Sequence, residues 1–288
     1  MSEASDPVTR PSLHPDLVRP VPARRMARPR HALPPRRSVI GVPVSITDYD
    51  GTVAAVIDAA CRRAPLLVTA LAVHGVVEAR TRPDVGRAVG AFDVVTPDGQ
   101  PVRMALNLLH RAGLTDRVYG PTLTLRICAA AAAACLPVYF YGSTPAVVAA
   151  LAQRLSAAFP GLIVAGAEPS LFRELTDAEG EALGRRIRAS GAGLVFVGLG
   201  CPRQELFAHR HRDVIGLPQI CVGAAFDFHA GTKRQAPRWM QDHALEWLFR
   251  LWQEPRRLVR RYAVTNTRFL LSLARQWAAP ETFSRSDR

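Results

Sequence analysis

The chain has 288 residues, of which 48% are hydrophobic and 21% are charged. These proportions are typical of a folded globular protein and exclude a collagen-like or a wholly disordered chain. The net charge is +13, and nearly all of the positive charge comes from arginine because Lys233 is the only lysine. Such a charge favours a polyanionic partner. The candidate classes are nucleic acid, an anionic membrane surface and a phosphorylated substrate.

Cysteine usage and hydropathy narrow the class of protein further. The cysteines form no CxxC pair, so neither a zinc cluster nor a disulfide framework is predicted. No run of about 18 apolar residues offers a membrane-spanning helix. The N-terminal region has acidic residues and prolines where a secretory signal needs an apolar run. We therefore expect a cytoplasmic protein with reduced thiols.

The chain divides into three parts by composition. Residues 1–37 are rich in proline and arginine, which predicts a disordered basic arm. From residue 38 to about 235, short apolar runs alternate with helical patterns. The predicted strands are 39–42, 66–71, 92–95, 138–141, 162–165, 194–197 and 220–222. This alternation predicts an α/β fold in which helices sandwich a largely parallel sheet.

Helix starts are marked at several places within this middle part. Thr144 suits the N-cap and Pro145 the first position of one helix. Thr176 and Glu179 have the spacing of a capping box, which predicts the start of another helix. A further helix is predicted over residues 52–62.

Residues 236–288 have a different amino-acid composition. They contain all four tryptophans, and basic side chains outnumber acidic ones. We expect a helical appendage here. Amphipathic, aromatic and arginine-rich helices lie on membrane surfaces or cover phosphate sites, and a solvated helix pair is the plainer alternative.

Two loops that follow predicted strands carry candidate functional groups. Asp98 lies in a Pro-Asp-Gly sequence, which is a common turn, but a carboxylate at the carboxyl edge of a parallel sheet can also act as a general base. Residues 199–205 (LGCPRQE) form a glycine loop that leads into a helix and can present amides to phosphate. This loop is neither a Walker loop nor a GxGxxG fingerprint. Cys201 has no histidine placed by the sequence to activate it as a nucleophile.

The sequence predicts no metal site. Asp48-Tyr49-Asp50 has the Asp-x-Asp pattern of metal-dependent glycosyltransferases, but acidic residues at this place also cap the helix predicted after them. Asp227 and His229 would supply two ligands and lack a third.

Ordered blocks of the sequence resemble the WecG/TagA/CpsF family of bacterial glycosyltransferases. The resemblance runs from about Val39 to Leu271, and its blocks include VVTPDG (94–99), DRVYG (116–120), GLGCPRQE (198–205), VGAAFDFHAG (222–231) and LEWLFRLWQEPRR (245–257). It implies a Rossmann-like domain with a C-terminal helical appendage. It also implies inverting transfer from a UDP-sugar, usually of the N-acetylmannosamine type, to a polyprenyl-diphosphate-linked saccharide, with no metal or other cofactor. Such a protein would work at the inner face of the cell membrane, in the synthesis of cell-surface polysaccharides.

The resemblance also assigns roles to individual residues. Asp98 matches the candidate general base, which takes the proton from the acceptor hydroxyl. Thr69, Arg117 and Gln204 match positions that hold substrate or organise the site. Asp227 lies in the block that resembles the nucleotide-binding segment.

The appendage supplies the remaining expected contacts. Arg250, Arg257 and Arg260 match arginines that approach the diphosphate, where guanidinium groups stabilise the charge of the leaving group. Leu71 stands where many family members have asparagine, so the identity of the donor sugar stays open. The oligomeric state stays open as well. Two alternatives remain: an arginine-rich nucleic-acid-binding protein, although no helix-turn-helix, zinc-finger or RRM signature is present, and a nucleotide-binding homologue without catalysis.

Overall fold

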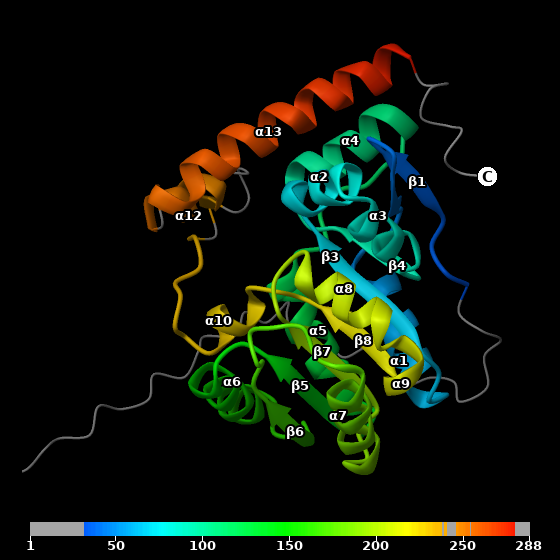
Figure 1. Ribbon diagram of the computed structural model, residues 1–288, viewed down its shortest axis with the longest axis vertical. Coiled ribbons are helices and arrows are strands. Elements are labelled where there is room, and N and C mark those ends of the chain that lie inside the picture. Colours follow the sequence, from blue (N-terminus) through cyan, green and yellow to red (C-terminus); the bar gives the residue numbers. More distant parts are fainter. Residues whose placement is uncertain (1–31, 238, 241–245, 254, 280–288) are drawn as a thin grey trace, which may run out of the picture.

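The computed structural model describes residues 32–237, 239–240, 246–253 and 255–279. Its centre is a six-stranded parallel sheet with the strand order β4-β3-β8-β7-β5-β6 (Figure 1). The strands are β3 (Leu66–Leu71), β4 (Val94–Pro97), β5 (Val138–Gly142), β6 (Val164–Glu168), β7 (Leu194–Gly198) and β8 (Pro218–Cys221). Strands β3, β4, β5, β7 and β8 are buried along their whole length or nearly so, as expected for a sheet that is covered on both faces.

Helices cover both faces of this sheet and form two apolar cores with it. One core includes side chains from α1 (Tyr49–Cys61), α5 (Gly120–Ala133), α6 (Pro145–Ala158) and α10 (Ala225–His229). The other includes side chains from α2 (Val73–Thr81), α3 (Pro83–Gly90), α4 (Gln100–His110), α7 (Asp177–Ala189), α8 (Arg203–Arg210) and α9 (Arg212–Ile215). The predicted α/β fold, with a parallel sheet between helices, is therefore confirmed.

The predicted helix starts are confirmed as well. The hydroxyl of Thr144 accepts a hydrogen bond from the Val147 amide at 3.3 Å, and Pro145 is the first residue of α6. Thr176 and Glu179 form a reciprocal capping box at the start of α7. These side chains satisfy amides that have no partner within their own helix, so each helix begins where the sequence places it.

The N-terminal part of the fold differs from the sequence prediction. Residues 39–42 do not form one strand; β1 (Arg36–Val39) and β2 (Val42–Ser45) pair as an antiparallel hairpin outside the central sheet. The chain reverses at Ile40 and Gly41, whose φ angles are 49° and 87°. Glycine adopts such angles readily, so Gly41 permits the turn. Strand β1 begins two residues before the boundary expected at 38, and residues 1–31 of the expected arm lie outside the described residues.

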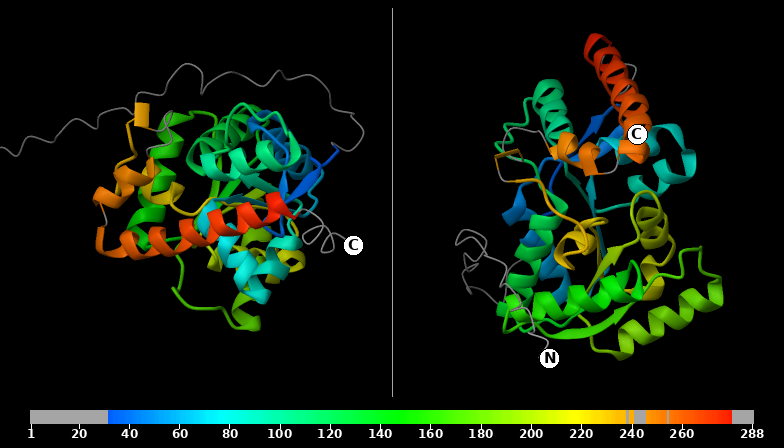
Figure 2. Two further views of the ribbon diagram at one scale, coloured as in Figure 1. Left: turned by 90° about the horizontal axis from the view of Figure 1, so that it is seen from above. Right: turned by 90° about the vertical axis from the view of Figure 1, so that its left-hand side faces the viewer.

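The expected C-terminal appendage is helical where it is described. It consists of α12 (Glu246–Gln253) and α13 (Pro255–Ala278), and α13 packs across α2 (Figures 1 and 2). Phe269 of α13 is only 1% exposed and belongs to the apolar core. The appendage therefore packs on the helix that begins directly after β3. No helix in the described part of the chain is both long enough and apolar enough to cross a membrane.

Candidate active site

Asp98 lies at the carboxyl edge of the sheet, directly after β4. The first amide of α5, that of Gly120, donates to its Oδ1 at 3.3 Å, and the side chain is half-buried. A methyl group added at Gly120 would lie 3.3 Å from the Ala70 side chain and 3.7 Å from Asp98 Oδ2. The glycine therefore lets α5 begin close against β3 and against the carboxylate. The positive end of the α5 dipole also favours the negative charge on Asp98.

Thr69 and Gln204 are brought together beneath this edge by a third residue, Glu205. The Thr69 hydroxyl and the Gln204 Nε2 both donate to Glu205 Oε1, at 2.7 and 2.9 Å. All three side chains are at most 2% exposed. Complete burial raises the pKa of Glu205, although the hydrogen bonds from Gln204 and Thr69 act in the opposite direction.

Two glycines, each in a loop that follows a strand, lie near the Gln204 side chain. Gly200 and Gly223 follow β7 and β8, and both have positive φ angles, of 76° and 53°. A methyl group added at Gly223 would lie 3.5 Å from Gln204 Oε1 and 3.9 Å from the Gly200 Cα. Gln204 Oε1 is buried, and within the described residues it accepts no hydrogen bond. The loops after β7 and β8 thus lie near a buried oxygen atom that can accept a hydrogen bond and receives none from the described residues.

Arg117 lies in the loop that leads into α5, three residues before Gly120. Its guanidinium group stacks over the Tyr119 ring, with the Cζ atom 4.3 Å from the ring centroid. The Tyr119 amide in turn donates to the Tyr49 hydroxyl at 3.0 Å, and burial raises the pKa of Tyr49 to about 12. The loop is therefore tied to the start of α1, which holds a half-buried cation near the beginning of α5.

Asp227 lies on α10, which follows β8 at the same edge of the sheet. Its carboxylate is 3.9 Å from the Lys233 ammonium group, and its carbonyl oxygen accepts hydrogen bonds from the amides of Thr232 and Lys233. His229, on the same helix, lies 2.9 Å from the Pro121 carbonyl oxygen, and burial lowers its pKa. These contacts fix α10 against the first turn of α5, so both helices border the region around Asp98.

Residues 37–282 match the family described as "Glycosyl transferase WecG/TagA/CpsF family". The chain belongs to this family. It is also similar to an N-acetylglucosaminyldiphosphoundecaprenol N-acetyl-beta-D-mannosaminyltransferase of Bacillus spizizenii, with 31% identity over 183 residues, which cover 62% of this chain and 68% of that protein. Membership confirms the predicted glycosyltransferase activity and favours it over the nucleic-acid-binding alternative.

The structure places three of the residues that the resemblance singled out near one edge of the family's fold. Asp98 follows β4, Thr69 lies in β3 and Gln204 in the first turn of α8. A hydrogen-bonded cluster joins Thr69 to Gln204. Their roles in catalysis or binding stay predictions.

The side chains of Arg250, Arg257 and Arg260 lie outside the described part of the structure. Arg250 belongs to α12, and the other two residues belong to the first turns of α13. Their predicted approach to the diphosphate stays a prediction.

Glu205 was not predicted as a site residue. It stands next to Gln204 in the GLGCPRQE block, and a charged residue beside an apolar helical pattern normally faces solvent. The feature that distinguishes it, contact with Thr69, joins residues 136 positions apart. The only signal in the sequence was its position within a block that resembles the family.

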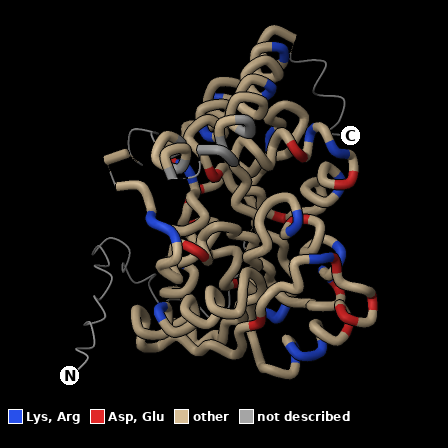
Figure 3. Tube along the Cα trace, turned by 60° about the vertical axis from the view of Figure 1, so that its left-hand side comes forward, with Lys and Arg blue, Asp and Glu red and all other residues tan. Residues whose placement is uncertain are grey.

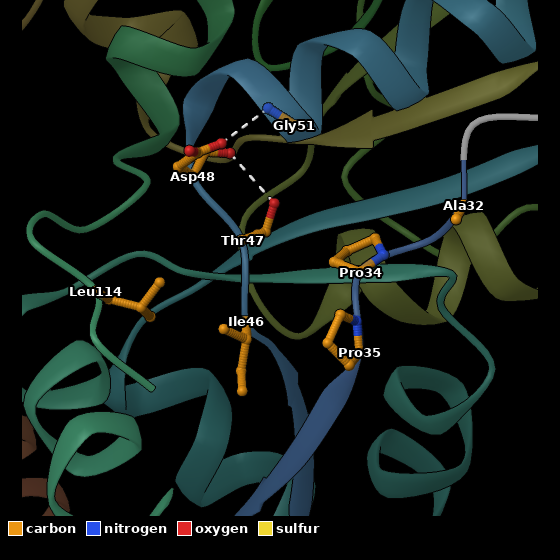
Figure 4. A pocket seen from close by; sticks show the side chains of 8 residues that line it. All are labelled: Ala32, Pro34, Pro35, Ile46, Thr47, Asp48, Gly51 and Leu114. Atoms are coloured by element: carbon orange, nitrogen blue, oxygen red, sulfur yellow. Dashed lines mark hydrogen bonds between the residues drawn. The ribbon is translucent and has the colours of Figure 1, made fainter. Parts of the chain in front are cut away.

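The interpretation of Asp48 as a helix cap is confirmed. Its Oδ1 accepts the Gly51 amide at 2.8 Å (Figure 4). Asp50 pairs with Arg126 at 3.0 Å. The hollow beside Asp48, of about 260 Å³, is otherwise lined by Thr47 and by apolar residues such as Pro34 and Ile46, so it offers no second ionisable group among its described lining residues. The described residues hold no group of three or more His, Cys, Asp or Glu side chains placed for a metal ion.

Cys201 does not have the surroundings of a nucleophile. Burial, together with the neighbouring Glu205 carboxyl group, raises the pKa of its thiol well above the ordinary value. A reactive cysteine needs the opposite shift, because the thiolate is the nucleophile. Burial therefore favours the neutral thiol, which lies beside Glu205.

Proposed function

We propose that this glycosyltransferase moves an N-acetylmannosamine-type sugar, or a related hexose, from a UDP-sugar to a polyprenyl-diphosphate-linked saccharide. The single observation that carries the proposal is Asp98, a carboxylate held by the first amide of α5 at the carboxyl edge of the sheet. Ligands of parallel α/β sheets bind at this edge. The name of the relative from Bacillus spizizenii, which acts on N-acetylglucosaminyldiphosphoundecaprenol, supports the same class of acceptor.

In the proposed reaction, Asp98 acts as general base. It takes the proton of the acceptor hydroxyl while that oxygen attacks the anomeric carbon of the donor. The bond between this carbon and the β-phosphate oxygen breaks, and UDP leaves with the electron pair. The attack comes from the face opposite to UDP, so the configuration at the anomeric carbon is inverted.

Cationic groups would stabilise the departing diphosphate. Arg117 is held by Tyr119 near the start of α5, and it is the candidate whose side chain is described. Arg250, Arg257 and Arg260 are the further candidates from the appendage. Guanidinium groups bind phosphate oxygens through paired hydrogen bonds, and charge on those oxygens grows in the transition state. The nucleotide would lie near Asp227 and the loops after β7 and β8.

We also infer that the appendage rests on the membrane that carries the acceptor. Several large apolar side chains of α12 and α13 face solvent, among them Trp252, Leu270, Leu271 and Trp277, which are 78%, 61%, 55% and 66% exposed. Residues 255–279 contain no acidic side chain, and Figure 3 shows basic positions along α13. Apolar and basic groups on one helix favour an anionic lipid surface. Peripheral binding at the inner face of the membrane would bring the edge of the sheet to its lipid-linked substrate.

The direct test is a transfer assay. The protein is incubated with UDP-N-acetylmannosamine and a short polyprenyl-diphosphate-linked N-acetylglucosamine, and the lipid product is identified by mass spectrometry. Other UDP-hexoses are tested in parallel because Leu71 leaves the donor open. Transfer that persists in EDTA supports the metal-independent mechanism. Absence of product with every UDP-sugar, from folded protein, would contradict the proposal.

The membrane inference is tested with vesicles. We expect the protein to sediment with vesicles that contain anionic lipid, and a variant with Leu271→Glu and Trp277→Glu to remain in the supernatant. Equal sedimentation of both proteins would contradict the inference.

A further inference from the structure

Glu205 is the buried junction of the candidate active site. Glu205 lies on α8, and its Oε1 joins this helix to β3 by accepting a hydrogen bond from the Thr69 hydroxyl at 2.7 Å. The same oxygen accepts a hydrogen bond from Nε2 of the neighbouring Gln204 at 2.9 Å. The side chain is 0% exposed, yet no arginine or lysine forms an ion pair with it within the described residues. A buried carboxyl group is costly unless it is neutral or paired, so its presence calls for a reason.

The geometry of Gln204 indicates that reason. Its amide nitrogen is bound by Glu205, which leaves the carbonyl oxygen pointing to the other side of the amide. That oxygen is buried and accepts no hydrogen bond within the described residues, and it faces Gly223, where an added methyl group would lie 3.5 Å away. Gly223 follows β8 at the carboxyl edge of the sheet. An acceptor that is desolvated in the free protein is suited to a ligand that supplies the missing donor.

Resting on the proposed function, we propose that Glu205 is a positioning residue that orients the Gln204 amide. It directs the carbonyl oxygen of Gln204 toward the nucleotide-sugar site, where this oxygen accepts a hydrogen bond from an N–H or O–H group of the donor. The uracil imide, an acetamido group and a sugar hydroxyl share this chemistry. Without Glu205, the amide can rotate and present its nitrogen, which would repel the same donor group.

The direction in which burial shifts the pKa of Glu205 is compatible with this role. Burial raises the pKa of its carboxyl group, and the nearby Cys201 thiol does not provide a positive charge to reverse the effect. In either protonation state, a carboxyl group can accept two hydrogen bonds at one oxygen. Glutamine has nearly the same shape and the same acceptor, so Glu205→Gln should preserve the arrangement, whereas Glu205→Leu should remove it.

Binding measurements test the proposal first. Dissociation constants for UDP and for UDP-sugars with and without an acetamido group are measured by calorimetry. For the ligand that carries the donor group, Glu205→Leu should weaken binding about tenfold, the effect of losing one hydrogen bond to a buried acceptor. Glu205→Gln should restore most of this loss. Weakening for UDP itself points to the uracil, and weakening only for acetamido sugars points to that group.

A double-mutant cycle separates positioning from a general structural role. If Glu205 acts through Gln204, then Glu205→Leu should add less than about twofold to the loss caused by Gln204→Leu. In the transfer assay, the loss should appear in the donor KM more than in kcat. Gln219→Leu is the matched control, since Gln219 is equally buried in the same sheet, in β8, and its substitution should change neither constant. Multiplicative losses, or a Gln variant as weak as the Leu variant, would overturn the proposal.

A measurement without ligand distinguishes this proposal from the proposed function. In NMR spectra, the Gln204 side-chain amide protons, assigned by their loss in Gln204→Leu, should exchange slowly in the wild type and in Glu205→Gln, and rapidly in Glu205→Leu. Equal exchange in all three proteins would overturn the positioning role even if sugar transfer is found. Protection together with no UDP binding and no transfer would instead refute the proposed function and leave the hydrogen-bonded arrangement established.

Discussion

Phe269 holds the appendage on the body of the protein, and its truncation has a calculable effect. The side chain is 1% exposed and packs in the core at the interface between α13 and α2. Replacing a buried phenylalanine by alanine costs about 3–5 kcal/mol. Because α13 is the last described helix, we expect the loss to act mainly on its docking. Every 1.4 kcal/mol changes an equilibrium tenfold, so the opening of α13 should increase at least about 100-fold.

Hydrogen exchange measured by mass spectrometry provides the assay. In Phe269→Ala, peptides from α13 should exchange at least about 100-fold faster, whereas peptides from β5 and β7 should keep their protection. Leu270→Ala is the control on the same helix, because Leu270 is 61% exposed and its truncation removes little buried surface. Unchanged exchange in α13, or equal acceleration throughout the sheet, would refute this description of the appendage.

Two further predictions concern the body of the fold. The Arg173 side chain and the Thr176 amide lower the pKa of Glu179 to about 2. The stabilising effect of this carboxylate is therefore present above the ordinary carboxyl pKa of 4.5 and is lost as the pH falls through about 2. Thermal melts of Glu179→Gln should show a shallower loss of stability in this range, and a pH profile identical to that of the wild type would contradict the assignment. Gly142 has a φ of 137°, and an added methyl group would lie 2.6 Å from the Gly198 carbonyl, so Gly142→Ala should cost about 3 kcal/mol or more in urea titrations. Gly113→Ala, with positive φ but no atom within 4 Å, should cost only about 1 kcal/mol.

Local patterns predicted the local structure well. The apolar run at 66–71 coincides with β3, and the capping residues Thr144 and Thr176 stand where their helices begin. Both signals depend on neighbours within a few residues, which the sequence displays directly. The hairpin of β1 and β2 was missed because the four apolar residues at its centre look like one strand, and only the positive φ angles at Ile40 and Gly41 turn it into a reversal.

Long-range contacts were not predictable in the same way. Gln276 accepts a hydrogen bond from the Ile40 amide at 2.5 Å, across 236 positions, and so anchors α13 beside the hairpin. Glu205 meets Thr69 only because β3 and β7 flank β8 in the sheet. The resemblance to the family singled out Asp98, Thr69 and Gln204, which lie near the carboxyl edge, and their roles stay predictions. The buried carboxyl group beneath them became evident only from the packing.

Asp98→Asn tests the proposed reaction most directly. The carboxamide oxygen can still accept the Gly120 amide, so the local geometry should persist while the base is lost. With saturating UDP-sugar and lipid-linked acceptor, kcat should fall about 100-fold or more, and the affinity for UDP should stay within about threefold. Turnover close to that of the wild-type protein would show that Asp98 is not the general base.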